Sequence, residues 1–153
     1  MDFWETIKKR HCVRSFAAKQ VSDDLIEKII SAGKLAPSAG GLQTWHFEII
    51  KEQKIKDDLT IASMMQKFIA QAPIVIVICA DVEKSAGTYG ERGRDLYAIQ
   101  DTAAATQNML LAVTDLGLGA CWVGAFDEDK VSQILNLPSQ LRPVVILPVG
   151  YKN

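Results

Sequence analysis

The sequence predicts a single domain in which helices alternate with four short strands. Three observations lead to this prediction. The chain has 153 residues, and a domain of this length buries roughly 68 to 70% of the surface of its unfolded chain. Neither an internal repeat nor a linker rich in Gly, Pro or Ser divides it. Short apolar or β-branched runs with turn signals beside them alternate with longer amphipathic segments.

A helix is predicted over residues 23–34, after an N-terminal helix that gives way to a loop near Arg10. Ser22 is expected to be its N-cap, and the acidic residues in the first turn should stabilise the helix by interacting with the positive end of its dipole. Gly33 and Pro37 are expected to end it. One face of this helix carries four aliphatic side chains, Leu25, Ile26, Ile29 and Ile30.

Four short runs are predicted to be strands. They are apolar over most of their length, which is typical of strands that are largely buried. Their residues are 46–50, 74–80, 120–126 and 144–149. A last helix is predicted over residues 128–136, with Asp127 as its cap and Val131, Ile134 and Leu135 facing inward.

Residues 95–116 predict a long helix of about 33 Å. Its side chains are apolar or alanine nearly all round, so most of its faces must be covered. A chain of this size has little with which to cover it, so we expect a second copy to pack against it. The expected contact uses the small side chains of Thr102, Ala103, Ala104 and Ala105.

The composition favours a globular protein with small-molecule partners. It is 48% hydrophobic and 23% charged, and the net charge of -1 indicates neither a nucleic-acid partner nor an anionic membrane. The longest apolar run, 74–80, is far below the roughly 20 residues of a spanning helix, and no signal peptide is recognisable, so we expect a cytoplasmic location. Cys12, Cys79 and Cys121 match neither a zinc site nor a disulfide framework, so we expect reduced thiols.

Two arginines follow the first helix. Arg10 and Arg14 lie four residues apart, so their guanidinium groups can converge on one anion such as a phosphate. The alternative is that both are solvated surface residues. His11 and Cys12 lie between them, but no second histidine stands at ligand spacing. We therefore expect neither a metal site nor a Cys-His nucleophile.

Two glycine-containing segments can bring backbone close to a ligand. The first is the turn at residues 37–41, followed by Gln43, whose amide both donates and accepts hydrogen bonds. The second is residues 117–126, where Gly124 interrupts an apolar run. A tight connection and ordinary core packing are the alternative explanations. The sequence contains no P-loop and no dinucleotide-binding fingerprint after a strand.

In this order, the motifs resemble those of the nitroreductase family of FMN-dependent oxidoreductases. The resemblance runs across essentially the whole chain. Residues 10–16 are similar to the family's opening pattern, Arg-Arg-Ser-x-Arg-x-Phe. Residues 36–47 are similar to its pattern Ala-Pro-Ser-x-x-Asn-x-Gln-Pro-Trp-x-Phe. The long helix and residues 116–126 resemble the family's segment beside the flavin N5.

The resemblance implies an α+β fold of three layers, α/β/α, with a central and mainly antiparallel sheet. It implies a homodimer formed through long helices, with two FMN sites at the subunit interface. The implied activity takes hydride from NAD(P)H onto flavin N5 and reduces nitroaromatic, quinone or similar electron-poor acceptors by a ping-pong mechanism. No catalytic side chain is implied, since the flavin carries the chemistry.

The implied cofactor-binding residues come from three segments. Arg10 would hold the phosphate, and Arg14 would lie near the ribityl chain and the pyrimidine side of the ring. The turn at 37–43 would come from the partner subunit, while backbone at 123–125 would face N5. The full set is Arg10, His11, Cys12, Arg14, Pro37, Ser38, Ala39, Gln43, Val123, Gly124 and Ala125. Weaker candidates are Lys67 for the pyrimidine edge and Tyr89, Arg92 and Arg94 for substrate contact. The last three lie in residues 82–95, for which a solvated loop is the alternative interpretation.

The sequence departs from the family pattern at several places. Gly41 replaces the family's Asn, Thr44 its Pro, and Cys12 a hydroxyl residue. Relatives usually continue past PVGYKN with a tail that carries Lys or Arg for the phosphate, so either the sequence is clipped or Arg10 binds with less help. A flavin-binding electron carrier or FMN storage protein would use the same residues. A specialised reaction, such as reductive dehalogenation or flavin breakdown, would usually need a lid with dedicated polar contacts.

Overall fold

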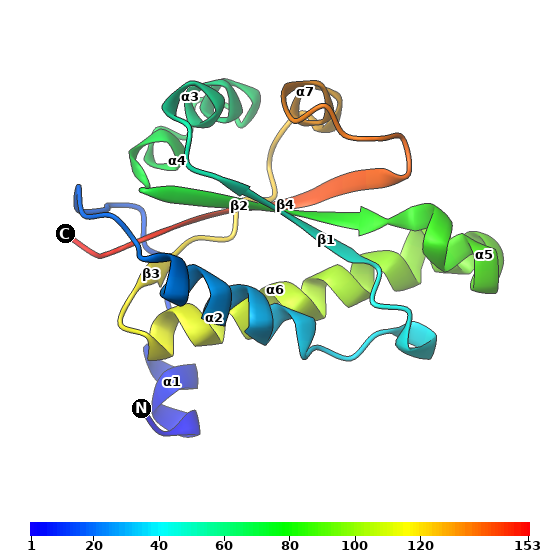
Figure 1. Cartoon of the computed structure of the whole chain (residues 1–153), viewed down its shortest axis with the longest axis horizontal. Coiled ribbons are helices and arrows are strands. Elements are labelled where there is room, and N and C mark those ends of the chain that lie inside the picture. The colour runs from blue at the N-terminus through cyan, green and yellow to red at the C-terminus, as the bar shows by residue number, and fades with distance from the viewer.

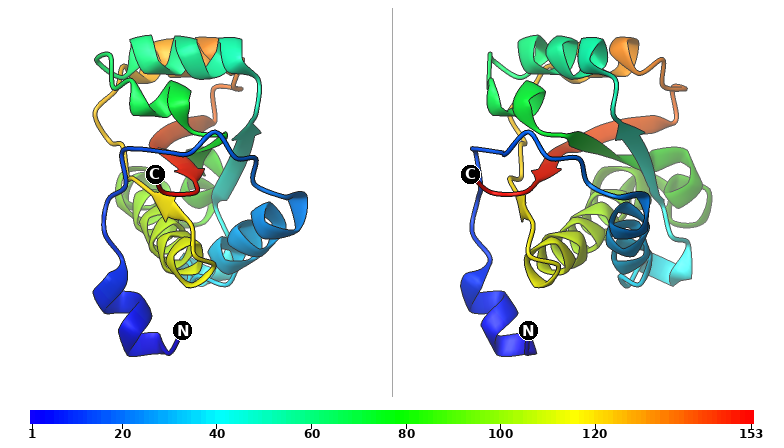
Figure 2. Two further views of the ribbon diagram at one scale, coloured as in Figure 1. Left: turned by 90° about the vertical axis from the view of Figure 1, so that its left-hand side faces the viewer. Right: turned by 60° about the vertical axis from the view of Figure 1, so that its left-hand side comes forward.

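The computed structural model describes residues 1–153 and has three layers (Figure 1). A four-stranded sheet forms the middle layer. Helices α2 (Asp23–Lys34) and α6 (Ala98–Asp115) cover one face, and α3 (Gln53–Ala62) and α7 (Glu128–Ile134) cover the other (Figure 2). The remaining helical elements are α1 (Phe3–Lys9), η1 (Ala39–Gly41), α4 (Phe68–Gln71), α5 (Val82–Arg92) and the π-helical turn η2 (Gly93–Tyr97). The predicted three-layer α+β architecture is confirmed.

The sheet is antiparallel throughout, in the order β1-β2-β4-β3. Its strands are β1 (Trp45–Ile50), β2 (Ile74–Asp81), β3 (Gly119–Ala120) and β4 (Leu141–Gly150). The predicted strands at 74–80 and 144–149 are therefore confirmed. The prediction of burial is wrong for β1, which is an edge strand with no neighbour on its outer side, and Ile49 on it remains 44% exposed.

Strand β2 contributes side chains to both hydrophobic cores, because successive side chains of a strand point to opposite faces of the sheet. Ile74, Ile76 and Ile78 pack in the cluster that contains α2 and α6. Val75 and Val77 pack in the cluster that contains α3, α4 and α7. A strand that is buried on both faces must be apolar at every position, which explains the uninterrupted run in the sequence.

The prediction of a strand at 120–126 is wrong beyond its first residue. Only Gly119 and Ala120 pair with β4, and Val123 returns to the sheet for a single bridge with Ile146. Trp122 before this bridge and Gly124 after it are exposed. The segment is thus a loop whose apolar residues are buried singly, and its backbone near Gly124 stays accessible.

Helix α2 has the predicted bounds, but two details of its ends differ. Ser22 occupies the N-cap position, yet its hydroxyl makes no capping hydrogen bond, and its carbonyl accepts from the N–H of Leu25 and Ile26. Gly33 lies inside the helix and does not end it. A Cβ at Gly33 would lie 2.9 Å from the Met109 Cγ, so this glycine is needed where α2 packs against α6.

The long helix begins three residues later than predicted. The π-helical turn η2 precedes it, and Gly117, with φ of 76°, follows its end as expected for a left-handed C-terminal glycine. Thr102 and Ala105 are fully buried within the chain, so the prediction that they contact a second copy is wrong. Ala103 and Ala104 lie half-buried on the outer face.

Two further helical segments bear on the predictions. Asp127 caps α7 as expected by accepting the Lys130 N–H at 3.1 Å, although α7 ends two residues before the predicted end. The segment 82–95 is helical, as α5 and the start of η2, so the prediction of a loop is wrong, although most of its residues are solvent-exposed as predicted. None of the helices is long and apolar enough to span a membrane.

Candidate functional site

The segment after α1 runs beside the start of the 119–126 loop. The Val13 N–H donates to the Ala120 carbonyl at 2.9 Å, and Cys12 pairs with Ala120 in a parallel bridge. The guanidinium of Arg14 lies over the ring of Phe68, 5.9 Å from its centroid. Sequence regions that are more than a hundred residues apart thus meet at one place, as the predicted cofactor site requires.

Arg10 and Arg14 have no acidic partner. Arg94 and Arg142 each form an ion pair with a glutamate, and Arg92 donates to the Tyr97 hydroxyl. Neither Arg10 nor Arg14 takes part in such a pair or in a comparable hydrogen bond. Two guanidinium groups that are not neutralised by the protein are therefore available to bind an anion. The ion pair of Arg94 also makes it a poorer candidate for substrate contact than predicted.

The loop at 123–125 offers open backbone a few residues beyond Ala120, where the arginine segment is paired. Val123 is buried, and its N–H donates to the Ile146 carbonyl at 2.9 Å. Gly124 and Ala125, in contrast, are exposed. A Cβ at Gly124 would meet nothing nearer than the Trp122 indole nitrogen at 3.7 Å, which is ordinary van der Waals contact. The protein's own packing therefore does not require glycine here, and the space above it is open to a ligand.

A glutamine that sequence reasoning missed holds this loop. The Gln66 Nε2 donates to the Ala125 carbonyl at 3.2 Å and to the Ser63 carbonyl at 3.0 Å. Lys67 follows Gln66 and is exposed at the start of α4. Its neighbour Phe68 is the residue whose ring contacts the Arg14 guanidinium. No motif surrounds Gln66 in the sequence, so only the folded structure reveals that it positions the loop.

The turn between α2 and β1 has the conformation that its glycines permit. Gly40 has a φ of 59° and Gly41 a φ of 66°, both in the left-handed region that favours glycine. The Ser38 hydroxyl accepts the Gln43 N–H at 2.9 Å across the turn, and Gln43 itself has a φ of 52°. A left-handed glutamine is strained, and such strain often accompanies functional positions.

Asp101 anchors this turn to the start of α6. Its carboxylate accepts the Ala39 N–H at 2.9 Å and the Thr44 hydroxyl at 2.7 Å, and it is only 4% exposed. Sequence reasoning missed it, although a carboxylate in the interior of an apolar helix, beside alanines and threonines, is the signal that marks such a residue; the only other one in α6, Asp115, is its last residue. The buried carboxylate satisfies two donors that would otherwise lie unpaired.

We expect Asp101→Ala to destabilise the protein by about 2 to 4 kcal/mol, because it leaves the buried Thr44 hydroxyl and the part-buried Ala39 N–H without an acceptor. Asp101→Asn keeps an acceptor oxygen and should lose roughly half as much. Urea unfolding of both variants measures the difference. Equal and small losses, below about 1 kcal/mol, would show that the carboxylate does not hold the turn.

Tyr89 lies against the same turn. A Cβ at Gly40 would collide with the Tyr89 hydroxyl, and the Tyr89 ring packs edge to face on Tyr97 with centroids 5.1 Å apart. Tyr89 is 38% exposed, so part of its ring faces solvent beside the turn. Its position is compatible with the predicted substrate contact and also fixes α5 against the turn.

Gly40→Ala should destabilise the protein by about 1 to 3 kcal/mol through left-handed strain and the clash with Tyr89. Gly87→Ala is the matched control, since Gly87 lies in α5 with open space around its Cβ position and should gain up to about 1 kcal/mol. Thermal unfolding compares them. Adding Tyr89→Phe to Gly40→Ala should recover only the steric part of the loss.

The two groups of predicted residues lie at opposite ends of one chain. The turn is tied to Asp101 in the first turn of α6, whereas the Cys12 segment is tied to Ala120 beyond its last turn. The fourteen helical steps from Asp101 to Asp115 separate these ends by about 21 Å. Figure 1 shows the arginine segment at the left and the turn at the lower right. A single chain therefore does not bring all the predicted residues together.

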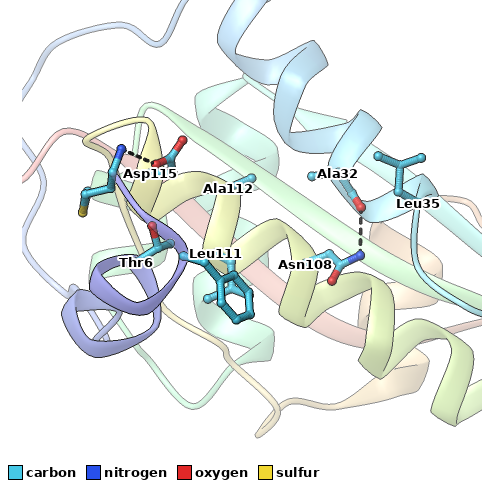
Figure 3. Close-up of a pocket in the computed structure, with 9 residues that line it drawn as sticks. Thr6, Ala32, Leu35, Asn108, Leu111, Ala112 and Asp115 are labelled. Atoms are coloured by element: carbon cyan, nitrogen blue, oxygen red, sulfur yellow. Dashed lines mark hydrogen bonds and ion pairs between the residues drawn. The ribbon is translucent and has the colours of Figure 1, made fainter.

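An apolar groove of about 450 Å³ runs along the outer face of α6, between α1 and α2 (Figure 3). The Asn108 side chain reaches across to the Ala32 carbonyl, and the N-terminal amine pairs with Asp115 at 2.9 Å. Phe3 and Leu35 in the groove are 64% and 82% exposed, and Trp4 next to Phe3 is 68% exposed. The residues that line it are Met1, Phe3, Thr6, Ala32, Leu35, Asn108, Leu111, Ala112 and Asp115.

Comparison with known families decides what this arrangement is. The family model described as "Nitroreductase family" matches residues 7–66 and 61–151, which together span nearly the whole chain.

The chain belongs to the nitroreductase family. Its sequence is 32% identical over 157 residues to a protein of Methanothermobacter thermautotrophicus that carries the provisional name NADH dehydrogenase/NAD(P)H nitroreductase. That match covers 99% of this chain and 78% of the relative. A relative of the same provisional name from Archaeoglobus fulgidus is 33% identical, with 95% of this chain and 82% of the relative covered. Family membership makes this chain an oxidoreductase.

Solved structures of the nitroreductase family have the same fold. The structure of a nitroreductase family protein from Clostridium novyi superposes with a TM-score of 0.91 at 31% identity, over 100% of this chain and 86% of that chain. A nitroreductase family protein from Clostridium difficile gives 0.87 at 32% identity, with 100% and 86% covered. The fold that the resemblance implied is thereby confirmed for the whole length of this chain.

Proposed function

We propose that this nitroreductase takes hydride from NAD(P)H onto a bound FMN and passes it to nitroaromatic, quinone or similar electron-poor acceptors. The observation that supports this most is the open backbone of Gly124 and Ala125 in the loop that begins where the segment of the unpaired Arg10 and Arg14 bridges Ala120. A phosphorylated, flat and anionic cofactor needs both features, a cationic group for its phosphate and backbone that a ring can approach.

The residues at this place fit FMN. Arg10 would bind the phosphate, and Arg14, held against Phe68, would lie toward the ribityl chain and the pyrimidine side, with Lys67 nearby. When bound, FMN supplies hydride transfer between nicotinamide and acceptor. The positive charge of Arg14 would stabilise negative charge that develops on its side of the site. The Gln66 side chain holds the Ala125 carbonyl in place by a hydrogen bond.

The second half of the site would come from a partner subunit. Pro37, Ser38, Ala39 and Gln43 lie about 21 Å from the arginine segment along α6, so they serve the flavin of the other chain. The apolar groove and the exposed rings of α1 support a homodimer, because an exposed apolar surface of this kind marks an interface. An isologous contact would give two equivalent FMN sites per dimer.

The site needs no side-chain acid, base or nucleophile in this proposal. Neither His11 nor His46 is central to it: His11 is exposed with a ring nitrogen 2.8 Å from the Lys9 carbonyl, and His46 pairs with Glu48 on an edge strand. The chain's task is to hold, orient and shield the cofactor. We place this activity in the cytoplasm, which the three free cysteines support.

Anaerobic mixing with nicotinamide tests the proposal. FMN-loaded protein should lose its flavin absorbance when NADH or NADPH is added, and regain it when a quinone or a nitroaromatic follows. Initial rates at several concentrations of both substrates should give parallel reciprocal plots, the pattern of a ping-pong mechanism. Bound flavin that neither nicotinamide reduces would contradict the proposal and support an electron carrier or FMN storage protein.

A further inference from the structure

We propose that Cys12 and Cys121 form a reversible intramolecular disulfide when the protein meets a low-molecular-weight disulfide such as oxidised glutathione. This pair would be a thiol-oxidation site at the edge of the proposed flavin site. The inference that the two thiols can join rests on the geometry of the chain alone. Only its coupling to FMN, stated below, rests on the proposed function.

The backbone places the two cysteines at disulfide distance. Cys12 and Ala120 are partners in a parallel bridge, so Cys121 is one residue out of register with Cys12. Neighbouring strands lie about 4.8 Å apart and a strand advances about 3.3 Å per residue, which puts the two Cα atoms about 6 Å apart. Disulfides span Cα separations of about 4.4 to 6.8 Å.

Successive side chains of a regular strand point to opposite faces, but the strand pairing ends at Ala120 and Cys121 begins the loop. The Cys121 thiol donates to the Trp122 carbonyl at 3.9 Å, and the side chains of Cys12 and Arg14 lie near enough to influence it. Burial, with a smaller contribution from the contact with Cys12, raises the pKa of Cys121 to about 11, while the Arg14 cation acts in the opposite direction. Cys121 is 2% exposed and stays protonated at neutral pH, whereas Cys12 is exposed to solvent.

The difference in exposure between the two thiols determines the order in which they react. The Cys12 thiolate attacks one sulfur of the oxidant disulfide, which forms a mixed disulfide and releases one thiol. The Cys121 sulfur then attacks the Cys12 sulfur, forms the Cys12–Cys121 bond and releases the second thiol. The protons of the two cysteines end on the two released thiols. The protein is oxidised by two electrons, and the oxidant disulfide is reduced to two thiols.

Cys79 provides a control within the same chain. It is fully buried in β2, and burial raises the pKa of its thiol to about 12. No second cysteine lies in its strand or in the paired strands β1 and β4. Cys79 should therefore remain reduced while the Cys12–Cys121 pair is oxidised.

The experiment incubates the full chain with oxidised glutathione at neutral pH and follows it by intact-mass analysis and non-reducing peptide mapping. Wild type and Cys79→Ser should lose two hydrogen atoms and give a peptide that links Cys12 to Cys121. Cys121→Ser should stop at the mixed disulfide, with glutathione on Cys12. Cys12→Ser should not react. Dithiothreitol should reverse each product.

Persistent glutathionylation of Cys12 in wild type, without the linked peptide, would overturn the inference, and so would an unmodified Cys12. The coupling to FMN is a separate arm. If FMN binds over Cys12, free FMN at about 100 times its dissociation constant should slow oxidation about 100-fold. A disulfide that forms at the same rate with FMN bound would leave the thiol pair intact as an inference and count against the proposed flavin position.

Discussion

Replacing Ala104 with arginine is expected to convert the protein to a monomer and to remove its flavin at the same time. Ala104 lies on the outer face of α6, where the proposed interface would bury it. An unpaired charge in such an interface costs about 3 kcal/mol or more, which corresponds to a weakening of dimerisation of more than about 100-fold. Sedimentation and flavin absorbance, measured on the same sample, report both losses.

The matched control is Gln133→Arg, an exposed position of α7 on the other face of the sheet. It adds the same charge and should leave both the dimer and the flavin unchanged. A stable Ala104→Arg monomer that retains stoichiometric FMN would show that each chain builds a complete site alone. That result would refute the shared site even if the enzyme remained active.

The second large effect is expected at the two unpaired arginines, and it should differ between them. Arg10→Ala removes a charge-assisted hydrogen bond to the phosphate worth about 1.5 to 3 kcal/mol, so FMN binding should weaken by about 10- to 150-fold. Arg14→Ala should mainly lower the flavin reduction potential and slow reduction by nicotinamide. Titration with FMN and a potentiometric titration of the holoprotein separate the two roles.

Arg142→Ala serves as the control for these variants, because Arg142 is occupied by its ion pair with Glu128. It should change neither FMN affinity nor potential. If Arg10→Ala and Arg14→Ala weaken FMN binding equally and leave the potential unchanged in the remaining holoprotein, the assigned roles are wrong.

Elements with a local signal could be predicted from the sequence, whereas contacts between distant residues could not. The run at 74–80 and the amphipathic pattern at 23–34 each reproduce the observed element, since burial on both faces and on one face leave different periodicities. The run at 120–126 has similar composition but is a loop after Ala120. Its residues are buried one at a time, which composition alone does not distinguish from a strand.

The candidate site shows the same division. The arginine and glycine motifs were visible in the sequence, and the structure brings the Arg14 segment to the 120–126 loop as expected. Asp101 and Gln66, which hold the two loops, went unrecognised because their partners lie about 60 residues away along the chain. Helical periodicity does not reveal which apolar face turns to the sheet, so the sequence predicts a dimer contact at Thr102 and Ala105, which are buried inside the chain.

The most direct test of the shared FMN site is complementation between two defective chains. One chain carries Arg10→Ala with Arg14→Ala, the other Ser38→Ala with Gln43→Ala, and a different affinity tag on each allows the mixed dimer to be isolated. In the mixed dimer one site receives both defects and the other receives none. We predict that neither parent dimer holds FMN tightly while the mixed dimer binds one FMN per two chains. A mixed dimer as empty as its parents would contradict a site built from both subunits.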